Sequence, residues 1–270
     1  MSFIVRGSSL PTFADCEGRW AVDNIPDLKK RYEGKGLQNV GSIFGTLAHK
    51  AGANLMTKKA ETGLVANWEP EAARVQAEFV ELISDGIRFD GITGSRNAGL
   101  IQLEKVIREF HYSVLPIARP EFIEQPFAFR IYGAEWLEVH CHPDLIELDG
   151  FIRDYKFSSQ DAKYFGQGGT YMRAFQAETG RKAKGFIIDW IRRCGESAPQ
   201  ADCISTPYLR EACLDASGHM LQRMVHALKK YEDTKRAWSF GFNPNSKYCG
   251  KKTCRAWGTD FCNQWIDKEK

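Results

Sequence analysis

Two aspartates and a lysine in the middle of the chain have the types and spacing of a metal-dependent hydrolytic site. Asp154 and Lys156 lie two residues apart in a short segment rich in β-branched and aromatic residues, which predicts a strand. Side chains alternate between the faces of a strand, so these two share one face while the Tyr155 side chain points into the opposite layer. Asp144 starts the preceding predicted strand, and a tight turn at Asp149–Gly150 would bring it alongside them.

Such a group of side chains suits a hard divalent cation. The carboxylates of Asp144 and Asp154, together with the backbone carbonyl of Tyr155, offer the oxygen ligands that Mg²⁺ or Mn²⁺ takes in proteins. A bound cation would polarise a phosphate and lower the pKa of its water, while Lys156 would orient that water or stabilise the developing charge. The nearby carboxylates would keep Lys156 protonated. An isolated Asp-x-Lys is equally compatible with a surface ion pair, so the assignment depends on the rest of the chain.

The pattern PDLI…DYK that contains these residues resembles the PD-(D/E)XK nuclease superfamily, in its RecB-like branch. Gln167 and Tyr171 match that branch's Q-x3-Y motif, and they lie four residues apart on one face of a predicted helix. The resemblance implies a restriction-endonuclease-like α/β core and a metal-dependent nuclease site. It also implies that the face carrying Gln167 and Tyr171 borders this site and contacts the DNA backbone.

Upstream residues supply further candidate ligands through the same resemblance. The segment GTLAH, which ends at His49, is similar to the branch's G-x3-H helix, in which the histidine is an extra metal ligand. Glu124 lies where many relatives carry a glutamate before the first strand, although Glu121 is an equally loose match, and His49 is the better candidate. His140 and His142 share a strand face and could bind a transition metal, but decoration of the strand before Asp144 is the simpler interpretation.

Four of the eight cysteines form a second candidate site. Cys249, Cys254 and Cys262 cluster in a Gly-containing tail, where three thiolates suit zinc or an iron–sulfur cluster but are one short of the usual four. The segment around Cys16 resembles the N-terminal cysteine segment of iron–sulfur RecB-like nucleases, which include the AddB nuclease domain, CRISPR-adaptation nucleases and exonuclease V. That resemblance implies a 4Fe–4S cluster that joins both ends of the domain. The spacing C-x4-C-x7-C is looser than in several relatives, so Zn²⁺ stays an alternative.

The apolar periodicity predicts the elements that must position these residues. Helices are expected over 41–55, 70–86, 95–113, 161–179 and 207–236. Short strands are expected at PFAFRIYG, EWLEVHCH, DLIELDG and FIRDYKF after Pro120, as a mainly antiparallel meander, and at GFIIDWI. The first third of the chain is expected to be all helical, and the tail from Phe240 onward irregular.

These elements predict an α/β fold: a PD-(D/E)XK core with one central mixed sheet flanked by helices, an N-terminal helical region and a cysteine-rich C-terminal tail. We expect one RecB-like nuclease domain over 1–270. It would comprise a mostly helical region at 1–120 that carries the first cluster cysteine, a catalytic α/β core at 121–236 and a cluster-binding tail at 237–270.

Composition narrows the class of protein. Hydrophobic content of 43% and charged content of 26% are ordinary for a globular protein, and the net charge of +3 neither demands nor excludes nucleic acid. No apolar run approaches the length of a membrane span, and the first residues lack the pattern of a secretory signal. We therefore expect a cytoplasmic protein without a membrane partner, whose cysteines bind metal or stay reduced.

The function expected from these features is DNA cleavage. The resemblance implies an exonuclease that acts on single-stranded DNA or DNA ends, with a helicase or other recombination or CRISPR proteins as possible partners. The alternatives are a non-catalytic DNA-binding or assembly subunit and an endonuclease. Cations near the predicted catalytic helix and a tail that mixes cations with aromatic rings are expected to bind phosphates and bases. These residues are Lys156, Lys163, Arg173, Arg181, Lys182 and Lys184, and in the tail Lys247, Tyr248, Lys251, Lys252, Arg255, Trp257 and Trp265.

Overall fold

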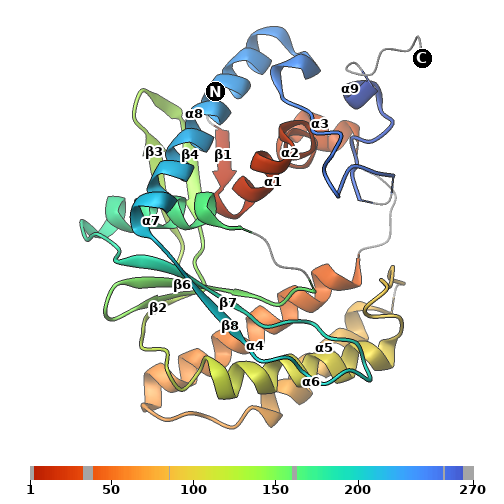
Figure 1. Ribbon diagram of the computed structural model, residues 1–270, viewed down its shortest axis with the longest axis vertical. Coiled ribbons are helices and arrows are strands. Elements are labelled where there is room, and N and C mark those ends of the chain that lie inside the picture. The colour runs from red at the N-terminus through yellow and green to blue at the C-terminus, as the bar shows by residue number, and fades with distance from the viewer. Residues whose placement is uncertain (1–2, 33–38, 85, 160–162, 252, 264–270) are drawn as a thin grey trace.

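The computed structural model describes residues 3–32, 39–84, 86–159, 163–251 and 253–263, and contains two mixed β-sheets with helices around them (Figure 1). One sheet has the strand order β1-β4-β3, and the other has the order β2-β5-β6-β7-β8. The strands are β1 (Phe3–Arg6), β2 (Pro120–Ile123), β3 (Phe127–Ile131), β4 (Ala134–Cys141), β5 (Leu145–Glu147), β6 (Phe151–Lys156), β7 (Gly185–Trp190) and β8 (Ile204–Tyr208). The helices are α1 (Leu10–Asp15), α2 (Glu17–Asn24), α3 (Pro26–Arg31), α4 (Val40–Thr62), α5 (Glu69–Leu82), α6 (Arg96–Ser113), α7 (Phe165–Thr179), α8 (Arg210–Thr234) and α9 (Asp260–Asn263). The predicted α/β class, with mixed sheets flanked by helices, is confirmed.

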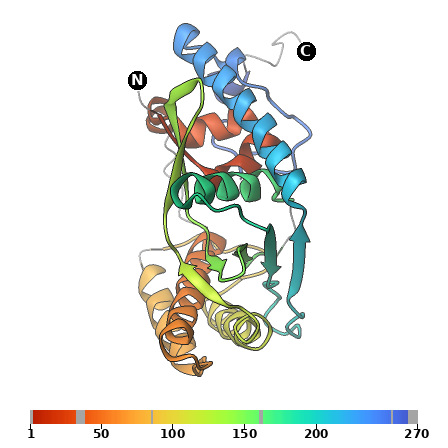
Figure 2. The same ribbon diagram turned by 90° about the vertical axis from the view of Figure 1, so that its left-hand side faces the viewer.

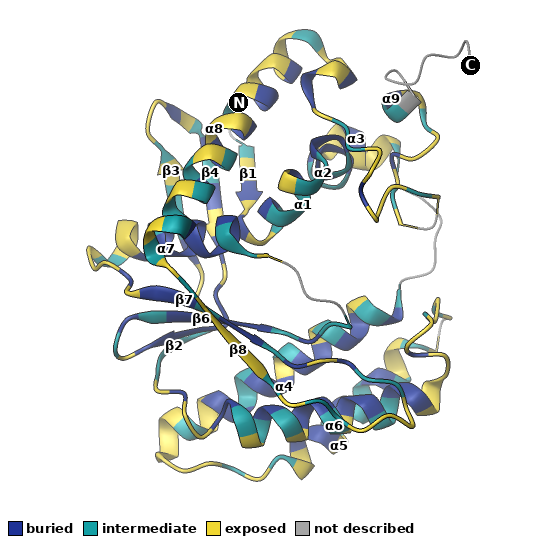
Figure 3. Ribbon diagram, viewed as in Figure 1, coloured by how far each residue is buried: buried dark blue, intermediate teal, exposed yellow. Residues whose placement is uncertain are grey.

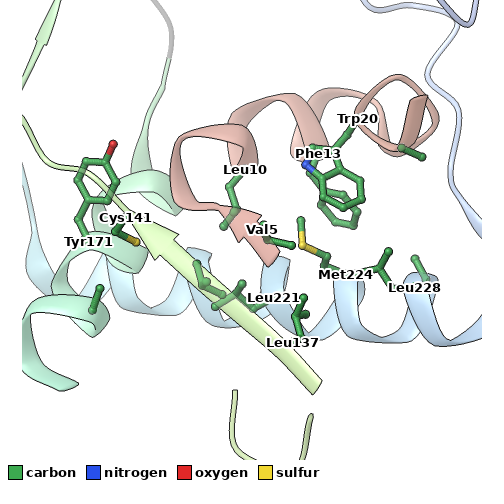
Figure 4. Close-up of a cluster of buried hydrophobic side chains, with 14 of the residues drawn as sticks. Val5, Leu10, Phe13, Trp20, Leu137, Cys141, Tyr171, Leu221, Met224 and Leu228 are labelled. Carbon is green, nitrogen blue, oxygen red and sulfur yellow. The ribbon is translucent and has the colours of Figure 1, made fainter. Parts of the chain in front are cut away.

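The three-stranded sheet and helices α1, α2, α7 and α8 share one hydrophobic core. Strand β1 pairs in parallel with β4, and α7 packs on β3 and β4 and along α8 (Figure 2). On α8, Leu221, Met224 and Leu228 recur at helical spacing, so one face of the helix is apolar. Figure 4 shows this face turned toward Val5 and Leu137 of the sheet. This core joins the N-terminal segment to the long C-terminal helix.

Helices α4, α5 and α6 form a second apolar cluster beneath the five-stranded sheet. Tyr155 points into it, as predicted from strand alternation, and its ring lies 4.9 Å from that of Phe110 between centroids. Arg153 lies on the same face of β6 and is almost fully buried. Its guanidinium pairs with Asp189 (Nη1–Oδ2 2.9 Å) and Glu147 (Nε–Oε2 3.1 Å), which neutralises charges that would be costly alone. The opposite face of β6 is thereby left for Asp154 and Lys156.

The predicted meander is divided between the two sheets. Strands β3 and β4 pair antiparallel in one sheet, whereas β5 pairs with β2 and β6 in the other, so the expectation of one central sheet was wrong. The division falls at His142–Asp144. Pro143 has no N–H to extend the β4 ladder, and the chain leaves the first sheet there. Because the first sheet ends at this point, Asp144 lies at the junction between the two sheets, immediately before β5.

The element boundaries differ from the sequence prediction at several places. The first third is not all helical, because β1 occupies Phe3–Arg6; four residues are too short for a periodic signal. The helix expected from 207 starts at Arg210, because Ile204–Tyr208 is an exposed edge strand that tolerates Pro207 (Figure 3). Helix α4 extends beyond the expected 41–55, α5 ends at Leu82, and α7 begins at Phe165; residues 161 and 162 of the predicted helix lie outside the described residues.

The tail from Phe240 consists mainly of turns, as predicted, with a single short helix, α9, at its described end. It lies beside α1 and α2, where two acidic residues attach it, the buried Glu17 and the half-buried Asp15. The Glu17 carboxylate accepts a hydrogen bond from the Gly241 N–H (2.8 Å), and the Asp15 carboxylate accepts one from the Ser246 hydroxyl (2.6 Å). Within the described residues, no helix is long and apolar enough to cross a membrane.

Candidate active site

Asp144 and Asp154 meet because β5 and β6 form a short antiparallel pair. Leu145 pairs with Arg153, so the residues flanking that pair, Asp144 and Asp154, are brought opposite each other. The connecting turn needs Gly150, whose φ of 88° lies in the left-handed region that favours glycine. The Tyr155 N–H donates a hydrogen bond to Asp144 Oδ2, which fixes this carboxylate against β6. The structure therefore brings together the two aspartates that the sequence singled out.

Asp154 and Lys156 form an ion pair on the common face of β6, through Oδ2 and Nζ. The ammonium also lies over the ring of Tyr164, 4.9 Å from its centroid. Burial alone would lower the pKa of Lys156, but the carboxylates of Asp154 and Asp144 raise it above its ordinary value, so the lysine is charged. Burial, with the charge of Asp144, raises the pKa of Asp154 to about 6 despite the opposing effect of Lys156.

Gln167 and Tyr171 form a short chain of hydrogen bonds that ends at Asp154. They project from successive turns of α7, the crossover helix between the parallel strands β6 and β7. Gln167 Nε2 donates to Asp154 Oδ1 (2.9 Å) and to Tyr171 Oη (2.8 Å). Both residues are only 2% exposed; Gln167 contacts the aspartate directly, and Tyr171 contacts Gln167. The contact with the DNA backbone that the resemblance implied is thus not available to them in this structure.

His49 approaches the aspartates from α4. Its Nδ1 lies 3.0 Å from Asp144 Oδ1, and its ring packs edge-on against Phe157 at 5.1 Å between centroids. Burial lowers the pKa of His49, but the negative charge of Asp144 outweighs this and raises it. Two residues separated by almost a hundred positions in the sequence therefore form one polar pair.

Glu124 also belongs to this cluster, and the structure separates it from its competitor Glu121. The Glu124 N–H donates to the backbone carbonyl of Asp144 (3.1 Å), and its carboxylate pairs with His142 (Nδ1–Oε2 2.8 Å). Glu124 adopts a φ of 49°, which is unusual for a non-glycine residue and is found where surrounding contacts determine the backbone. Burial, with the charge of Asp144, raises its pKa to about 8. Glu121 instead pairs with Arg181 at the surface.

The geometry fits a divalent cation. One ligand atom from each of His49, Glu124 and Asp144 lies within 4.8 Å of the other two, and Asp154 lies on the neighbouring strand. One imidazole nitrogen and several carboxylate oxygens suit Mg²⁺ or Mn²⁺. Burial and the negative charge of Asp144 together raise the pKa values of Glu124 and Asp154, and a bound cation would offset both effects. The sequence ranked Glu124 below His49 because its match to the family pattern was loose, and only the fold shows that it lies beside Asp144.

The four predicted cluster cysteines line a single cavity of about 870 Å³ between α2 and the C-terminal tail. Cys16 lies at the N-terminus of α2, and Cys249, Cys254 and Cys262 come from the tail that the Asp15 and Glu17 contacts hold in place. Apart from these sulfurs the lining is largely aromatic and small, with Arg19 as its one cation among the described residues. Cys141 and Cys213, by contrast, are buried in the apolar core away from this cavity.

The expected DNA-binding cations are only partly free for that role. Arg173 donates to the Ser217 hydroxyl (3.1 Å) and to the Leu214 carbonyl (3.0 Å), which joins α7 to α8. Arg181 is engaged by Glu121. In the tail, Lys247 lies over the Tyr248 ring (5.1 Å), while Lys252 and Trp265 lie outside the described residues. His140 is 3.5 Å from Glu138, and neither it nor His142 joins a three-residue metal group among the described residues.

Comparison with known proteins agrees with this geometry. The family model described as the PD-(D/E)XK nuclease superfamily matches residues 7–257. The chain is similar to the crystal structure of a "Putative exonuclease" from Eubacterium rectale, with a TM-score of 0.58 and 14% sequence identity, over 98% of this chain and 89% of that one. At this identity the likeness concerns the fold. No curated protein matches the chain.

Proposed function

Because the chain belongs to the PD-(D/E)XK nuclease superfamily, we propose that it is a metal-dependent DNA exonuclease with its active site at Asp144, Asp154 and Lys156. The observation that carries the proposal is the cluster in which His49, Glu124 and Asp144 offer ligand atoms within 4.8 Å of one another. The name of the Eubacterium rectale protein supports exonuclease rather than endonuclease activity, and the fold likeness spans nearly the whole chain. We propose single-stranded DNA or DNA ends as the substrate.

In this proposal each side chain has a distinct part. His49, Glu124, Asp144 and Asp154, with the Tyr155 carbonyl, would hold Mg²⁺ or Mn²⁺, which when bound supplies Lewis-acid activation of the phosphate and of water. Lys156 stays charged beside Asp154, in a position to neutralise negative charge on the scissile phosphate or to orient the attacking water.

Gln167 and Tyr171 act on the reaction through Asp154. Their hydrogen bonds fix the direction in which Asp154 presents its oxygens, because Gln167 Nε2 occupies one lone-pair direction of Oδ1. A carboxylate fixed in this way loses little conformational freedom when it binds a cation, so we propose that the pair positions a ligand and does not itself touch the substrate.

We further propose that the cysteine cavity binds a 4Fe–4S cluster through Cys16, Cys249, Cys254 and Cys262. The supporting observation is that all four thiols line one cavity, although Cys16 is separated from the others by most of the chain.

The wider setting follows from the proposed activity. A RecB-like nuclease domain spanning 1–270 and lacking a P-loop motif within this sequence would depend on another protein, such as a helicase, for any ATP-driven unwinding. We propose a cytoplasmic role in DNA repair, recombination, phage or CRISPR-adaptation processing. The exposed cations of the tail would add sequence-independent, salt-dependent affinity for the phosphate backbone.

End-labelled linear DNA and circular single-stranded DNA, each with Mn²⁺ or Mg²⁺, test the activity. The wild type should shorten linear strands and leave circles intact, while Asp154→Asn and Lys156→Ala should bind DNA and fail to cleave it. Thr57→Leu, at an exposed position on α4 remote from the site, serves as the folding and handling control. Cleavage of circles would replace exonuclease with endonuclease, and equal activity in all variants would refute the site assignment.

The cluster is tested separately by metal analysis of anaerobically purified protein. We expect about four iron atoms and four acid-labile sulfides per chain, with loss of both in Cys254→Ser. Cys194→Ser is the matched control, because Cys194 does not line the cavity. One zinc ion without sulfide would establish the zinc alternative.

A further inference from the structure

Gly45 in α4 is a glycine that the packing of the protein does not require. Nine glycines lie within α-helices of the described residues. A Cβ atom added to eight of them would meet neighbouring atoms within 4 Å, so close packing accounts for their lack of a side chain; these are Gly18, Gly41, Gly52, Gly99, Gly166, Gly168, Gly169 and Gly218. At Gly45 the same Cβ would meet no atom of the described residues within 4 Å. Folding alone would thus favour alanine there, since glycine is among the poorest helix formers.

The place of this glycine in the site supplies a reason for it. Gly45 precedes His49 by four residues, so the two lie on one face of α4, and both are partly exposed. Side chains on a helix lean toward its N-terminus, so the His49 ring lies over the turn that begins at Gly45. The bare backbone of Gly45 therefore lies immediately beside a side chain that contacts Asp144.

We propose that Gly45 leaves the surface open for the DNA strand to approach the metal site, which makes it a residue that determines substrate access. The occupant is the sugar–phosphate backbone next to the scissile bond, because that is the part of DNA that must reach His49, Asp144 and Lys156. A side chain at residue 45 would project from the helix into this approach. The inference rests on the proposed nuclease function, since it assigns the open surface to that enzyme's substrate.

Neighbouring residues on the same helix show that exposure alone does not produce this feature. Ser42, Thr46 and Lys50 are also exposed on α4 near Gly45 and His49, and they carry ordinary side chains. The exposed position without a side chain is the one that precedes His49 by a single turn. Among the described residues, packing, turn geometry and helix propensity give no reason for glycine there, and substrate approach does.

The test compares Gly45→Ala and Gly45→Leu with the wild type in steady-state cleavage of single-stranded DNA. We expect kcat/KM of Gly45→Leu to fall by about 100-fold, mainly through KM, because the added side chain displaces the strand from the site. Gly45→Ala should show a smaller loss in the same direction. Both variants should have an equal or higher Tm than the wild type, and unchanged Mn²⁺ affinity by calorimetry.

Thr57→Leu is the matched control, because it adds a large apolar side chain to an exposed position of the same helix, three turns further on. It should cleave like the wild type. If Gly45→Leu keeps wild-type KM, or if it loses Mn²⁺ affinity in parallel with activity, the inference is wrong while the nuclease function stands. A wild type that binds Mn²⁺ but neither binds nor cleaves DNA would overturn the proposed function and this inference together.

Discussion

Replacement of Gln167 by methionine tests whether this residue positions Asp154 or contacts DNA. The substitution keeps the length and volume of the side chain but removes the N–H groups that reach Asp154 Oδ1 (2.9 Å) and Tyr171 Oη (2.8 Å). A hydrogen bond to a charged group contributes about 1.5–3 kcal/mol. That free energy corresponds to a factor of about 10–100, which is also the usual cost of removing a residue that orients a metal ligand.

We therefore expect Gln167→Met to lower kcat by about 10- to 100-fold and to raise the Mn²⁺ concentration for half-maximal activity, with little change in KM for DNA. The assay is initial-rate cleavage of an end-labelled strand, titrated separately with DNA and with Mn²⁺. Tyr171→Phe is the control, because it removes only the hydroxyl that accepts the second hydrogen bond and leaves Gln167 in contact with Asp154. Its loss should stay below about tenfold, the value of one neutral hydrogen bond.

An effect on KM for DNA in place of kcat would refute a positioning role for Gln167. If Gln167→Met raised KM for DNA and left kcat and the Mn²⁺ dependence unchanged, Gln167 would contact the substrate, as the family resemblance implied. The 2% exposure of Gln167 in the present structure would then have to increase when DNA binds.

Three other substitutions test the framework around the site. Arg153→Met removes the partner of two buried carboxylates, so it should destabilise the protein by about 3–5 kcal/mol in urea denaturation. Unchanged stability would contradict the pairing. Gly169→Ala places a Cβ 2.0 Å from a backbone oxygen of α8 and should lower the unfolding free energy by roughly 1–3 kcal/mol, measured in the same way. Burial raises the pKa of Glu71, but hydrogen bonds, the first from Arg74, lower it below its usual 4.5 overall. The Glu71 carboxylate thus stabilises the fold at neutral pH, and this contribution disappears as the pH falls through the lowered pKa, so Glu71→Gln should lower Tm at pH 7 and not in strong acid; a difference that persists in acid would argue against it.

Local sequence determined the pieces of the site that lie on adjacent or single elements. Asp154 and Lys156 share a face because strand side chains alternate, and Gly150 permits the turn that returns Asp144 to them. Gln167 and Tyr171 share a helix face for the corresponding reason, the period of the α-helix. These relations span few residues, so backbone geometry alone is enough to predict them.

Tertiary structure decided what the local pattern left open. The division of the meander into two sheets depends on which strands find partners, and β1 and β2 pair with strands far from them in the sequence. Glu124 was ranked below His49 on a loose match, and only the fold shows its N–H bonded to the Asp144 carbonyl and its carboxylate paired with His142. The burial of Gln167 depends in the same way on the packing of α7 against both sheets.

The cysteine cavity depends both on local sequence and on tertiary structure. The tail cysteines could be recognised from their spacing, and family resemblance supplied Cys16 as the fourth ligand. Only the fold shows that Cys16 and Cys262 line one cavity, because hydrogen bonds from Gly241 and Ser246 to the segment around Cys16 hold the two ends together. The sequence by itself thus determined which residues are candidates for the chemistry, through types, short-range spacing and family resemblance. The tertiary structure decided which of them meet, because long-range contacts depend on packing free energy that no local pattern contains.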